Sequence, residues 1–285
     1  MRAGFIGLGN IGAPMAEWLV KSSFETTVYD TNPEAVRELV AAGARAATSG
    51  RELAAASDVM GVCVRDDADV LDVVLGEDGL LAGATPGSVI ALHSTILPRT
   101  VTEVGRLAAK RGVGVVDACI TGGRAGAQQG TLTYMVGGES EHLERVRPAL
   151  ETSAAKIIHT GPLASGAATK LCNNLMTYLG FLAAFEATHL ARNAGLSQQA
   201  LEEVTATNGN MSQQMLRFLA LHKVSPEQQK SESFQTVIRS YADLAEKDLT
   251  VTLAFARENG VTLPGTALCQ QLMARVYGVL DENRR

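Results

Sequence analysis

A glycine-rich segment near the start of the sequence has the spacing of a phosphate-binding turn. The run Gly7-Leu8-Gly9-Asn10-Ile11-Gly12 matches G-x-G-x-x-G and lies between an apolar, strand-like run and a helical stretch. In this pattern the first glycine permits a tight turn, the second lets the backbone approach a pyrophosphate, and the third lets the helix pack on the strand. The N–H groups of Asn10 and Ile11 would face the anion at the helix N-terminus. The segment therefore predicts a dinucleotide site.

A carboxylate follows the second apolar run of the sequence. Asp30 lies near the position where a dinucleotide-binding domain contacts the adenosine ribose. A carboxylate there accepts hydrogen bonds from a free 2′-hydroxyl and repels a 2′-phosphate, and the next residues, Thr31 and Asn32, supply no arginine. The pattern favours NAD over NADP. For Asp30 alone, the alternative is a role in a turn or a helix cap.

Thr121, Gly122 and Gly123 form a second segment that could bind an anion. Adjacent glycines expose backbone N–H groups to which a carboxylate can bind, and the threonine hydroxyl adds a donor. The residues that follow, 125–133, are small and typical of turns. Taken alone, the segment is equally consistent with an ordinary loop.

A third group lies in an otherwise apolar helical stretch. Lys170, Asn173 and Asn174 share one helix face, because residues three and four apart are neighbours on a helix. A lysine surrounded by apolar residues loses hydration, which favours the neutral amine and permits proton exchange near neutral pH. The alternative is a lysine that extends to solvent beside two exposed amides.

Composition excludes several classes of protein. The 285 residues carry a formal net charge of −5, which argues against a nucleic-acid partner. The four cysteines and five histidines are scattered without ligand spacing, so we expect no metal site. The longest uncharged stretch near the middle, Leu171 to Phe185, is too short and too polar to cross a bilayer. We therefore expect a soluble, cytoplasmic protein with no membrane partner.

The elements that must position these residues change in type halfway along the chain. Up to about residue 160, short apolar runs alternate with helical stretches, which predicts a doubly wound α/β domain with a mostly parallel sheet. The expected strands are 3–8, 26–29, 59–64, 88–92, 114–117, 132–136 and 156–159. The expected helices between them are 10–21, 33–43, 98–111 and 139–151.

After Gly161 and Pro162 the strand patterns end, and the remainder predicts an all-helical domain. The expected helices are 165–193, 197–207, 234–259 and 265–282. Segment 225–233 is rich in Gln, Lys and Ser and is expected to be an exposed loop. The predicted domains are therefore 1–161, which would bind NAD, and 162–285, which would serve substrate binding and oligomerisation.

Four segments together resemble the β-hydroxyacid dehydrogenases, the family of 3-hydroxyisobutyrate dehydrogenase, which is related to 6-phosphogluconate dehydrogenase. GFIGLGNIGAPMA is similar to the cofactor signature of the family, and DACITGGRAGAQQGTLTYMVGG to its substrate-binding segment. GPLASGAATKLCNNLM resembles its catalytic segment, and EKDL at 246–249 its C-terminal motif. The resemblance covers essentially the whole chain. It implies a Rossmann domain followed by an all-helical domain, with the active site between them.

The resemblance also implies a role for each group. Lys170 would be the general acid/base, Asn174 would orient the substrate with help from Asn173, and Thr121, Gly122 and Gly123 would hold its carboxylate. The cofactor would be contacted by the glycine segment, Asp30, and a further set of four residues: Val64, Arg65, Thr95 and Lys247. With Asp248, Lys247 would close the cleft. The implied reaction is hydride transfer between NAD and a small 3-hydroxy acid, interconverting it with its semialdehyde or keto acid.

The chain departs from the family pattern at several positions. Thr121 stands where serine is common, and Leu92-His93 stands where an aspartate often occurs. Ser240 occupies the position of an aromatic residue. Arg124 and Arg239 are candidates for binding a second anionic group, although an exposed surface role is the simpler interpretation for both.

Two other functions stay open at this point. An imine reductase would share the architecture, but Lys170 and Asp30 both argue against it. A non-catalytic NAD-binding module would have no reason to keep the pair Lys170 and Asn174. The apolar residues between Leu175 and Phe185 exceed what a small helical domain easily covers, so we expect a homodimer or homotetramer.

Overall fold

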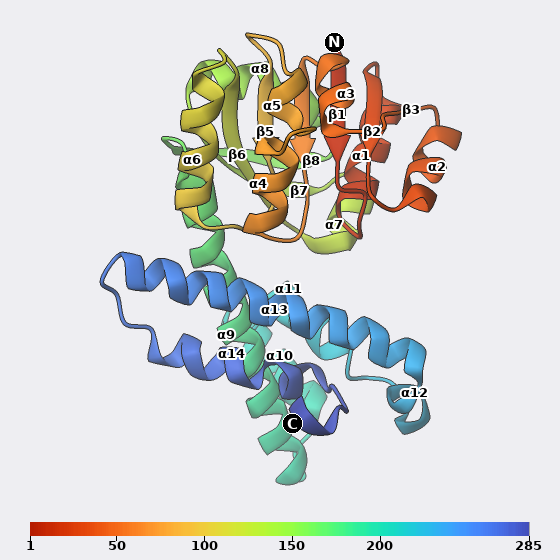
Figure 1. The fold of residues 1–285 in the computed structure, drawn as a ribbon. Helices are drawn as coiled ribbons and strands as arrows, with labels where there is room; N and C mark the ends of the chain where they lie inside the picture. The colour runs from red at the N-terminus through yellow and green to blue at the C-terminus, as the bar shows by residue number, and fades with distance from the viewer. Residues whose placement is uncertain (285) are drawn as a thin grey trace. The chain divides into compact units, whose positions relative to one another are not determined.

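The computed structural model describes residues 1–284 and divides them into two compact units, Met1–Lys170 and the chain from Leu171 onward. The first unit contains an eight-stranded sheet with helices on both faces (Figure 1). Its strands are β1 (Arg2–Ile6), β2 (Glu25–Tyr29), β3 (Arg45–Ala46), β4 (Val59–Val62), β5 (Val89–Leu92), β6 (Gly114–Thr121), β7 (Leu132–Gly137) and β8 (Ala154–Gly161).

The strand order is β3-β2-β1-β4-β5-β6-β7-β8, and every neighbouring pair is parallel except β6 and β7. This confirms the expected mostly parallel, doubly wound sheet. Because parallel strands point the same way, the residues that follow β1, β2, β4, β5 and β6 meet at one edge of the sheet. The order reverses between β1 and β4, the place where such sheets bind ligands.

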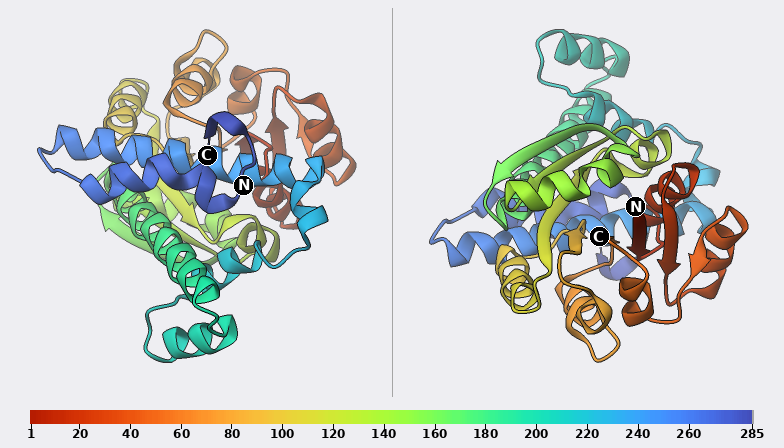
Figure 2. Two further views of the ribbon diagram at one scale, coloured as in Figure 1. Left: turned by 90° about the horizontal axis from the view of Figure 1, so that it is seen from below. Right: turned by 90° about the horizontal axis from the view of Figure 1, so that it is seen from above.

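Eight helices of this unit cover the sheet. They are α1 (Gly12–Lys21), α2 (Pro33–Ala41), α3 (Gly50–Ala55), α4 (Asp67–Leu75), α5 (Leu80–Gly83), α6 (Pro98–Ala109), α7 (Gly123–Gln129) and α8 (Ser140–Glu151). One apolar core lies between the sheet and α1, α2 and α8, and a second lies between the sheet and α3 to α6. In the right-hand view of Figure 2, α8 in green and α4 to α6 in orange to yellow lie on opposite sides of the strands.

The residues of the central strands β1, β4, β5 and β6 alternate between these two cores. Phe5 and Ala91 face the first core, whereas their chain neighbours Ile6 and Leu92 face the second. A strand that is buried on both faces must be apolar along its length, which explains the continuous apolar runs in the sequence.

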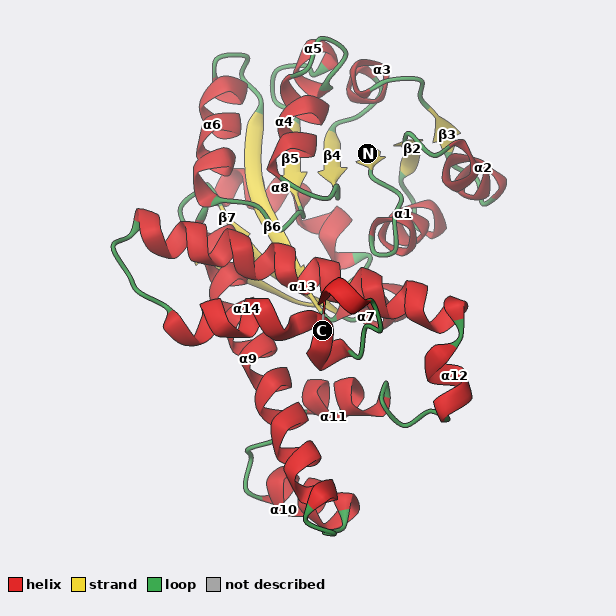
Figure 3. Ribbon diagram, turned by 60° about the horizontal axis from the view of Figure 1, so that its bottom comes forward, coloured by secondary structure: helices red, strands yellow, loops and turns green. Residues whose placement is uncertain are grey.

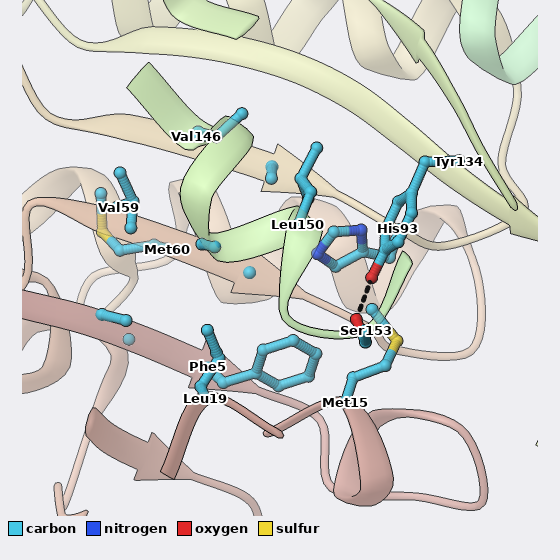
Figure 4. A pocket seen from close by; sticks show the side chains of 15 residues that line it. Phe5, Met15, Leu19, Val59, Met60, His93, Tyr134, Val146, Leu150 and Ser153 are labelled. Carbon is cyan, nitrogen blue, oxygen red and sulfur yellow. Dashed lines mark hydrogen bonds between the residues drawn. The ribbon is translucent and has the colours of Figure 1, made fainter. Parts of the chain in front are cut away.

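A small cavity of about 30 Å³ lies in the first core, between the sheet and α8 (Figure 4). His93 borders it, stacked on the ring of Phe5, and its Nδ1–H donates to the carbonyl of Ala118 at 2.8 Å. Burial lowers the pKa of His93 to about 4, so its ring is neutral at physiological pH. Tyr134 and Ser153 share a hydrogen bond of 2.7 Å across the cavity. Because the cavity has room for only about one water molecule, it is a packing void of the core rather than a ligand site.

The second unit is helical and has its own apolar core. Its elements are α9 (Ser165–Asn193), which begins in the first unit, α10 (Gln198–Thr207), α11 (Gln213–Ala220), α12 (Pro226–Lys230), α13 (Glu232–Glu258), α14 (Pro264–Tyr277) and the short 3₁₀ turn η1 (Glu282–Arg284). Helices α13 and α14 lie side by side, joined by a short loop (Figure 3). This confirms the expected all-helical second half.

Several expectations for individual segments were wrong. Segment 225–233 is not a loop: it contains α12 and the start of α13, whose caps Ser225 and Ser231 accept hydrogen bonds from backbone N–H groups. The expected helix 265–282 ends at Tyr277, because Gly278 adopts a positive φ of 83° that closes the helix. Strand β6 continues past Asp117 to Thr121, and the small residues after it form α7. The patterns also missed β3 and several short helices, namely α3, α4, α5 and α11.

The hydrogen bond between Tyr134 and Ser153 provides a test of the sheet unit. Both side chains are buried, with exposures of 1% and 2%. Tyr134→Phe leaves the Ser153 hydroxyl without its partner, and we expect a loss of about 1–3 kcal/mol in the free energy of unfolding. Urea unfolding followed by the fluorescence of Trp18, the one tryptophan in the sequence, measures this loss. The double variant with Ser153→Ala should lose less, and an equal or larger loss would contradict the assignment.

Candidate active site

The glycine segment after β1 leaves space at the N-terminus of α1. Gly7 has a φ of 90°, and its N–H donates to the carbonyl of Tyr29 at 3.2 Å, so the turn is tied to β2. A side chain on Gly12 would collide with the carbonyl oxygen of Gly7, whereas one on Gly9 would meet nothing within 4 Å. The space over Gly9 and the absence of a side-chain cap from Ile11 leave the N-terminus of α1 accessible to an anion. These residues fit a dinucleotide pyrophosphate.

Asp30 faces this segment from the end of β2. Its Oδ2 accepts the N–H of Leu8 at 2.6 Å, and its Oδ1 accepts the N–H of Asn32 at 2.7 Å. These two hydrogen bonds make the carboxylate a fixed part of the turn. The turn-forming role does not exclude the expected role of a ribose ligand. Each oxygen retains a lone pair that can accept a further hydrogen bond from a hydroxyl group.

The segments after β4 and β5 are joined by a pair of hydrogen bonds. Ser94 Oγ donates to the carbonyl of Val64 at 2.8 Å and lies 3.0 Å from the N–H of Val64. Thr95 follows at the same sheet edge. The Arg65 side chain is 82% exposed and pairs with Asp69 one turn along, at 3.0 Å. The structure thus places Val64, Arg65 and Thr95 along the edge that contains the glycine segment.

Thr121 is the last residue of β6, and the two glycines begin α7. Gly122 and Gly123 have φ values of 127° and 63°, which side chains rarely adopt. The turn brings the N-terminus of α7 to the same sheet edge as α1. The Arg124 guanidinium lies 3.4 Å from Asn10 Oδ1, so it is next to the glycine segment even though its side chain is exposed.

Lys170 and Asn174 lie one turn apart on the continuous helix α9, as the spacing predicted. The start of this helix is bound by Asp117, a fully buried residue of β6 that the sequence analysis did not identify as functional. Its Oδ1 accepts the N–H of Ala164 at 2.8 Å and its Oδ2 accepts the N–H of Ala167 at 2.7 Å.

Within the helical unit, Asn174 is buried against Asp248 of α13. The Asn174 amide donates to Asp248 Oδ2 at 2.7 Å, and the hydroxyl of Tyr178 lies 3.3 Å from the same oxygen. Burial, and then the nearby charge of Asp248, raise the pKa of Tyr178, so its hydroxyl is protonated. Asp248 Oδ1 lies 2.8 Å from Lys247 Nζ in an ion pair rather than an aligned hydrogen bond. Asn173 reaches the oxygen of Asn174 at 3.4 Å.

Arg239 is not part of this arrangement. Its guanidinium forms ion pairs with Glu232 at 2.6 Å and with Asp281 at 3.0 Å. These bonds tie the end of the chain to α13, which is the surface role that the sequence favoured.

Comparisons with known proteins give one family match over the sheet unit and another over the helical unit. Residues 2–161 match the model of the NAD binding domain of 6-phosphogluconate dehydrogenase. Residues 164–283 match the NAD-binding domain of NADP-dependent 3-hydroxyisobutyrate dehydrogenase. The chain belongs to the β-hydroxyacid dehydrogenase family. This confirms the enzyme class expected from the sequence, an NAD(P)-dependent oxidoreductase.

Individual relatives cover most of the chain. The chain is 40% identical over 200 residues to NAD-dependent L-serine dehydrogenase of Pseudomonas aeruginosa, covering 70% of this chain and 67% of the relative. It is 33% identical to 3-hydroxyisobutyrate dehydrogenase of the same organism, covering 95% and 90%. A solved structure of Mycobacterium tuberculosis 3-hydroxyisobutyrate dehydrogenase with L-serine is 30% identical, with a TM-score of 0.81, and covers 98% of this chain and 96% of that one.

Two kinds of feature are absent from the residues that the structure describes. Among residues 1–284, no group of three or more His, Cys, Asp or Glu side chains is arranged to hold a metal ion. None of the helices in that range combines the length and apolar character that crossing a membrane requires.

The buried carboxylate of Asp248 yields a second prediction. Asp248→Ala leaves the Asn174 amide and the Tyr178 hydroxyl without their acceptor, and we expect a loss of about 2–4 kcal/mol in the stability of the helical unit. Circular dichroism during urea unfolding measures it.

Asp243→Ala is the control, because the Asp243 side chain is 62% exposed and pairs with Arg284 at the surface. We expect that variant to lose less than about 1 kcal/mol. Equal losses in the two variants would contradict the importance of the buried carboxylate.

Proposed function

We propose that this protein is an NAD-dependent dehydrogenase of small 3-hydroxy acids, with Lys170 as general acid/base. The observation that carries the proposal is the placement within the sheet unit. The glycine segment and the Thr121–Gly123 turn lie at one sheet edge, and the helix bearing Lys170 is bound to the strand that ends in Thr121. A site of this kind has what hydride transfer needs: a cofactor cradle, an anion-binding turn and an amine.

The chemistry of the relatives supports the substrate class. L-Serine and 3-hydroxyisobutyrate, which appear in the names of two relatives, both carry a primary alcohol on the carbon next to the one that bears a carboxylate. Thr121 Oγ1 and the N–H groups of Gly122 and Gly123 supply donors for such a carboxylate. Anchoring it fixes the distance to the alcohol and so limits the substrate to 3-hydroxy acids.

Lys170 would then complete the reaction. NAD bound in the glycine segment would supply the acceptor for the hydride of the hydroxyl-bearing carbon. The neutral amine of Lys170 takes the hydroxyl proton at the same time, so the products are the aldehyde or ketone, the reduced cofactor and a proton on Nζ. In the reverse direction the ammonium group returns that proton to the carbonyl oxygen. Asn174, one turn further along α9, would orient the substrate, with its own amide held by Asp248.

Asp30 would set the cofactor preference. A carboxylate at this place accepts hydrogen bonds from the two hydroxyls of the adenosine ribose and repels a 2′-phosphate. Val64, Arg65 and Thr95 lie along the same edge and would border the cofactor, and Lys247 would approach it from the helical unit. We therefore expect turnover with NAD to exceed turnover with NADP.

Lys170→Ala tests the central role. We expect turnover with the best 3-hydroxy acid to fall by about 10²–10⁴-fold, because a positioned acid/base contributes that much. Binding of NADH, measured by its fluorescence, should change little. Lys110→Ala, an exposed lysine at the end of α6, is the matched control. Normal turnover in Lys170→Ala, or a loss explained by lost cofactor binding, would refute the role.

The substrate class is tested by following the absorbance of the reduced cofactor with a panel of compounds. The panel contains L-serine, 3-hydroxyisobutyrate and 3-hydroxypropionate, each with NAD and NADP, and primary alcohols of the same size without the carboxylate. A cyclic imine is assayed separately with NADH and with NADPH. Turnover confined to the acids supports the proposal. Turnover of a cyclic imine with NADPH alone would favour an imine reductase, and no turnover at all would favour a binding module.

The helical unit also presents apolar side chains that a second copy could cover. Phe181 is buried in the core of its own unit, whereas Leu179, Leu182 and Phe185 are only partly buried against that core. The most exposed apolar residues are instead Met176, Leu190 and Leu196, at 74%, 71% and 64%. We propose a homodimer or homotetramer formed through this unit.

Light scattering after size-exclusion chromatography measures the assembly. We expect a mass of two or four times 30.0 kDa. A monomer at assay concentration would contradict the proposal, and Leu190→Glu should shift the assembly toward the monomer.

A further inference from the structure

We infer that Asp117 is a positioning residue for Lys170: its carboxylate binds the first turn of α9 to β6 and thereby fixes where the amine lies relative to the Thr121–Gly123 turn. The inference rests on the proposed function, because it assigns Asp117 a task only if Lys170 acts in the reaction.

Both oxygens of the Asp117 carboxylate accept hydrogen bonds at the start of α9. Asp117 has no exposed surface, and each oxygen accepts one backbone N–H, from Ala164 at 2.8 Å and from Ala167 at 2.7 Å. These donors belong to the N-terminal end of α9, where the helix dipole favours negative charge. Burial raises the pKa of Asp117, and the N–H groups of Ala167 and Ala164 oppose the rise. Two N–H donors aimed at the two oxygens favour the ionised form, which has acceptor lone pairs on both oxygens and no proton to place.

The helix begins in direct contact with the sheet backbone. A Cβ on Gly166 would lie 2.5 Å from the carbonyl oxygens of Asp117 and Met135. A Cβ on Gly137, in β7, would lie 2.5 Å from Asp117 Oδ1 and 2.8 Å from the N–H nitrogen of Gly166. No side chain fits at either glycine, so the first turn of α9 packs closely against β6 and β7.

The residue that leads into the helix has an unfavourable backbone conformation. Ala164 has a φ of 78°, and no other non-glycine residue in the described chain has a positive φ. Alanine adopts this region only when surrounding contacts hold it there. The Ala164 N–H donates to Asp117 Oδ1. The carboxylate that accepts the Ala167 N–H inside α9 therefore also stabilises the turn before the helix.

The position of Asp117 in β6 connects its two hydrogen bonds to the proposed chemistry. Asp117 and Thr121 lie on one strand, four residues apart, and Ala167 and Lys170 lie on one helix, three residues apart. The Asp117 carboxylate therefore links the strand that ends in Thr121 directly to the helix that carries the amine. A displacement of about 1 Å at a reacting group can cost about 10²-fold in rate.

A double-mutant cycle distinguishes positioning from general support of the fold. Wild type, Asp117→Asn, Lys170→Ala and the double variant are compared with saturating NAD and the best substrate of the panel. Asp117→Asn keeps one acceptor and turns an amide donor toward the other N–H. We expect kcat to fall at least tenfold when Lys170 is present and less than twofold in the Lys170→Ala background. The Kd for NADH should stay within twofold.

Asp58→Asn is the matched control. Asp58 accepts the backbone N–H of Arg2 at 2.9 Å and its guanidinium at 2.7 Å, at the opposite edge of the sheet. We expect kcat to stay near the wild-type value in that variant. Equal fold losses from Asp117→Asn in both backgrounds would show a merely structural role and overturn the inference, as would wild-type kcat in Asp117→Asn.

Failure of the inference and failure of the proposed function give different results. Wild-type kcat in Lys170→Ala refutes both, whereas an inactive Lys170→Ala with an unaffected Asp117→Asn refutes the inference alone. If Asp117→Asn does not fold, the cycle is run with Ser165→Ala, which removes the 2.7 Å hydrogen bond to Thr160 at the same junction. The expected loss is then at least threefold and confined to the background that contains Lys170. The same loss in the Lys170→Ala background overturns the inference.

Discussion

The parallel direction of the strands is the constraint on which the site depends. Because β1, β2, β4, β5 and β6 all run the same way, the residues that follow them gather at one edge, although the first of these segments begins at Gly7 and the last at Gly122. The strands are short and buried on both faces, so their apolar residues fix their register and leave the following segments free for binding. The antiparallel pairing of β6 with β7 ends this series.

Much of this arrangement follows from the sequence. The glycine segment was placed correctly between a strand and a helix because its turn needs those glycines, and α9 was predicted with both ends correct because the apolar spacing marks it clearly. The short helices α3, α5 and α7 were missed because they contain one or two turns, which is too little for a helical period to show. The N-cap Ser49 was an available signal for α3, and the N-cap Asp66 was one for α4, which was also missed.

The residues that hold the functional candidates in place were harder to predict. Asp117 lies inside an apolar strand and binds residues 47 and 50 positions further along the chain. Asp248 accepts the amide of Asn174 across 74 positions. Neither pairing has a local pattern, since partners brought together by the fold leave no spacing rule in the sequence. The enzyme class was therefore readable from the sequence, whereas the buried carboxylates that hold the candidate residues were not.

The hydrogen bond from Leu8 to Asp30 has a consequence for how cofactor selectivity could evolve or be engineered. The carboxylate that would discriminate against a phosphorylated ribose also completes the glycine turn that receives the pyrophosphate. Replacing it by a small neutral residue would make room for the phosphorylated nucleotide. The same change would leave the Leu8 N–H in the glycine turn without its acceptor. A change of coenzyme at this position would thus require a second substitution that restores an acceptor for the Leu8 N–H.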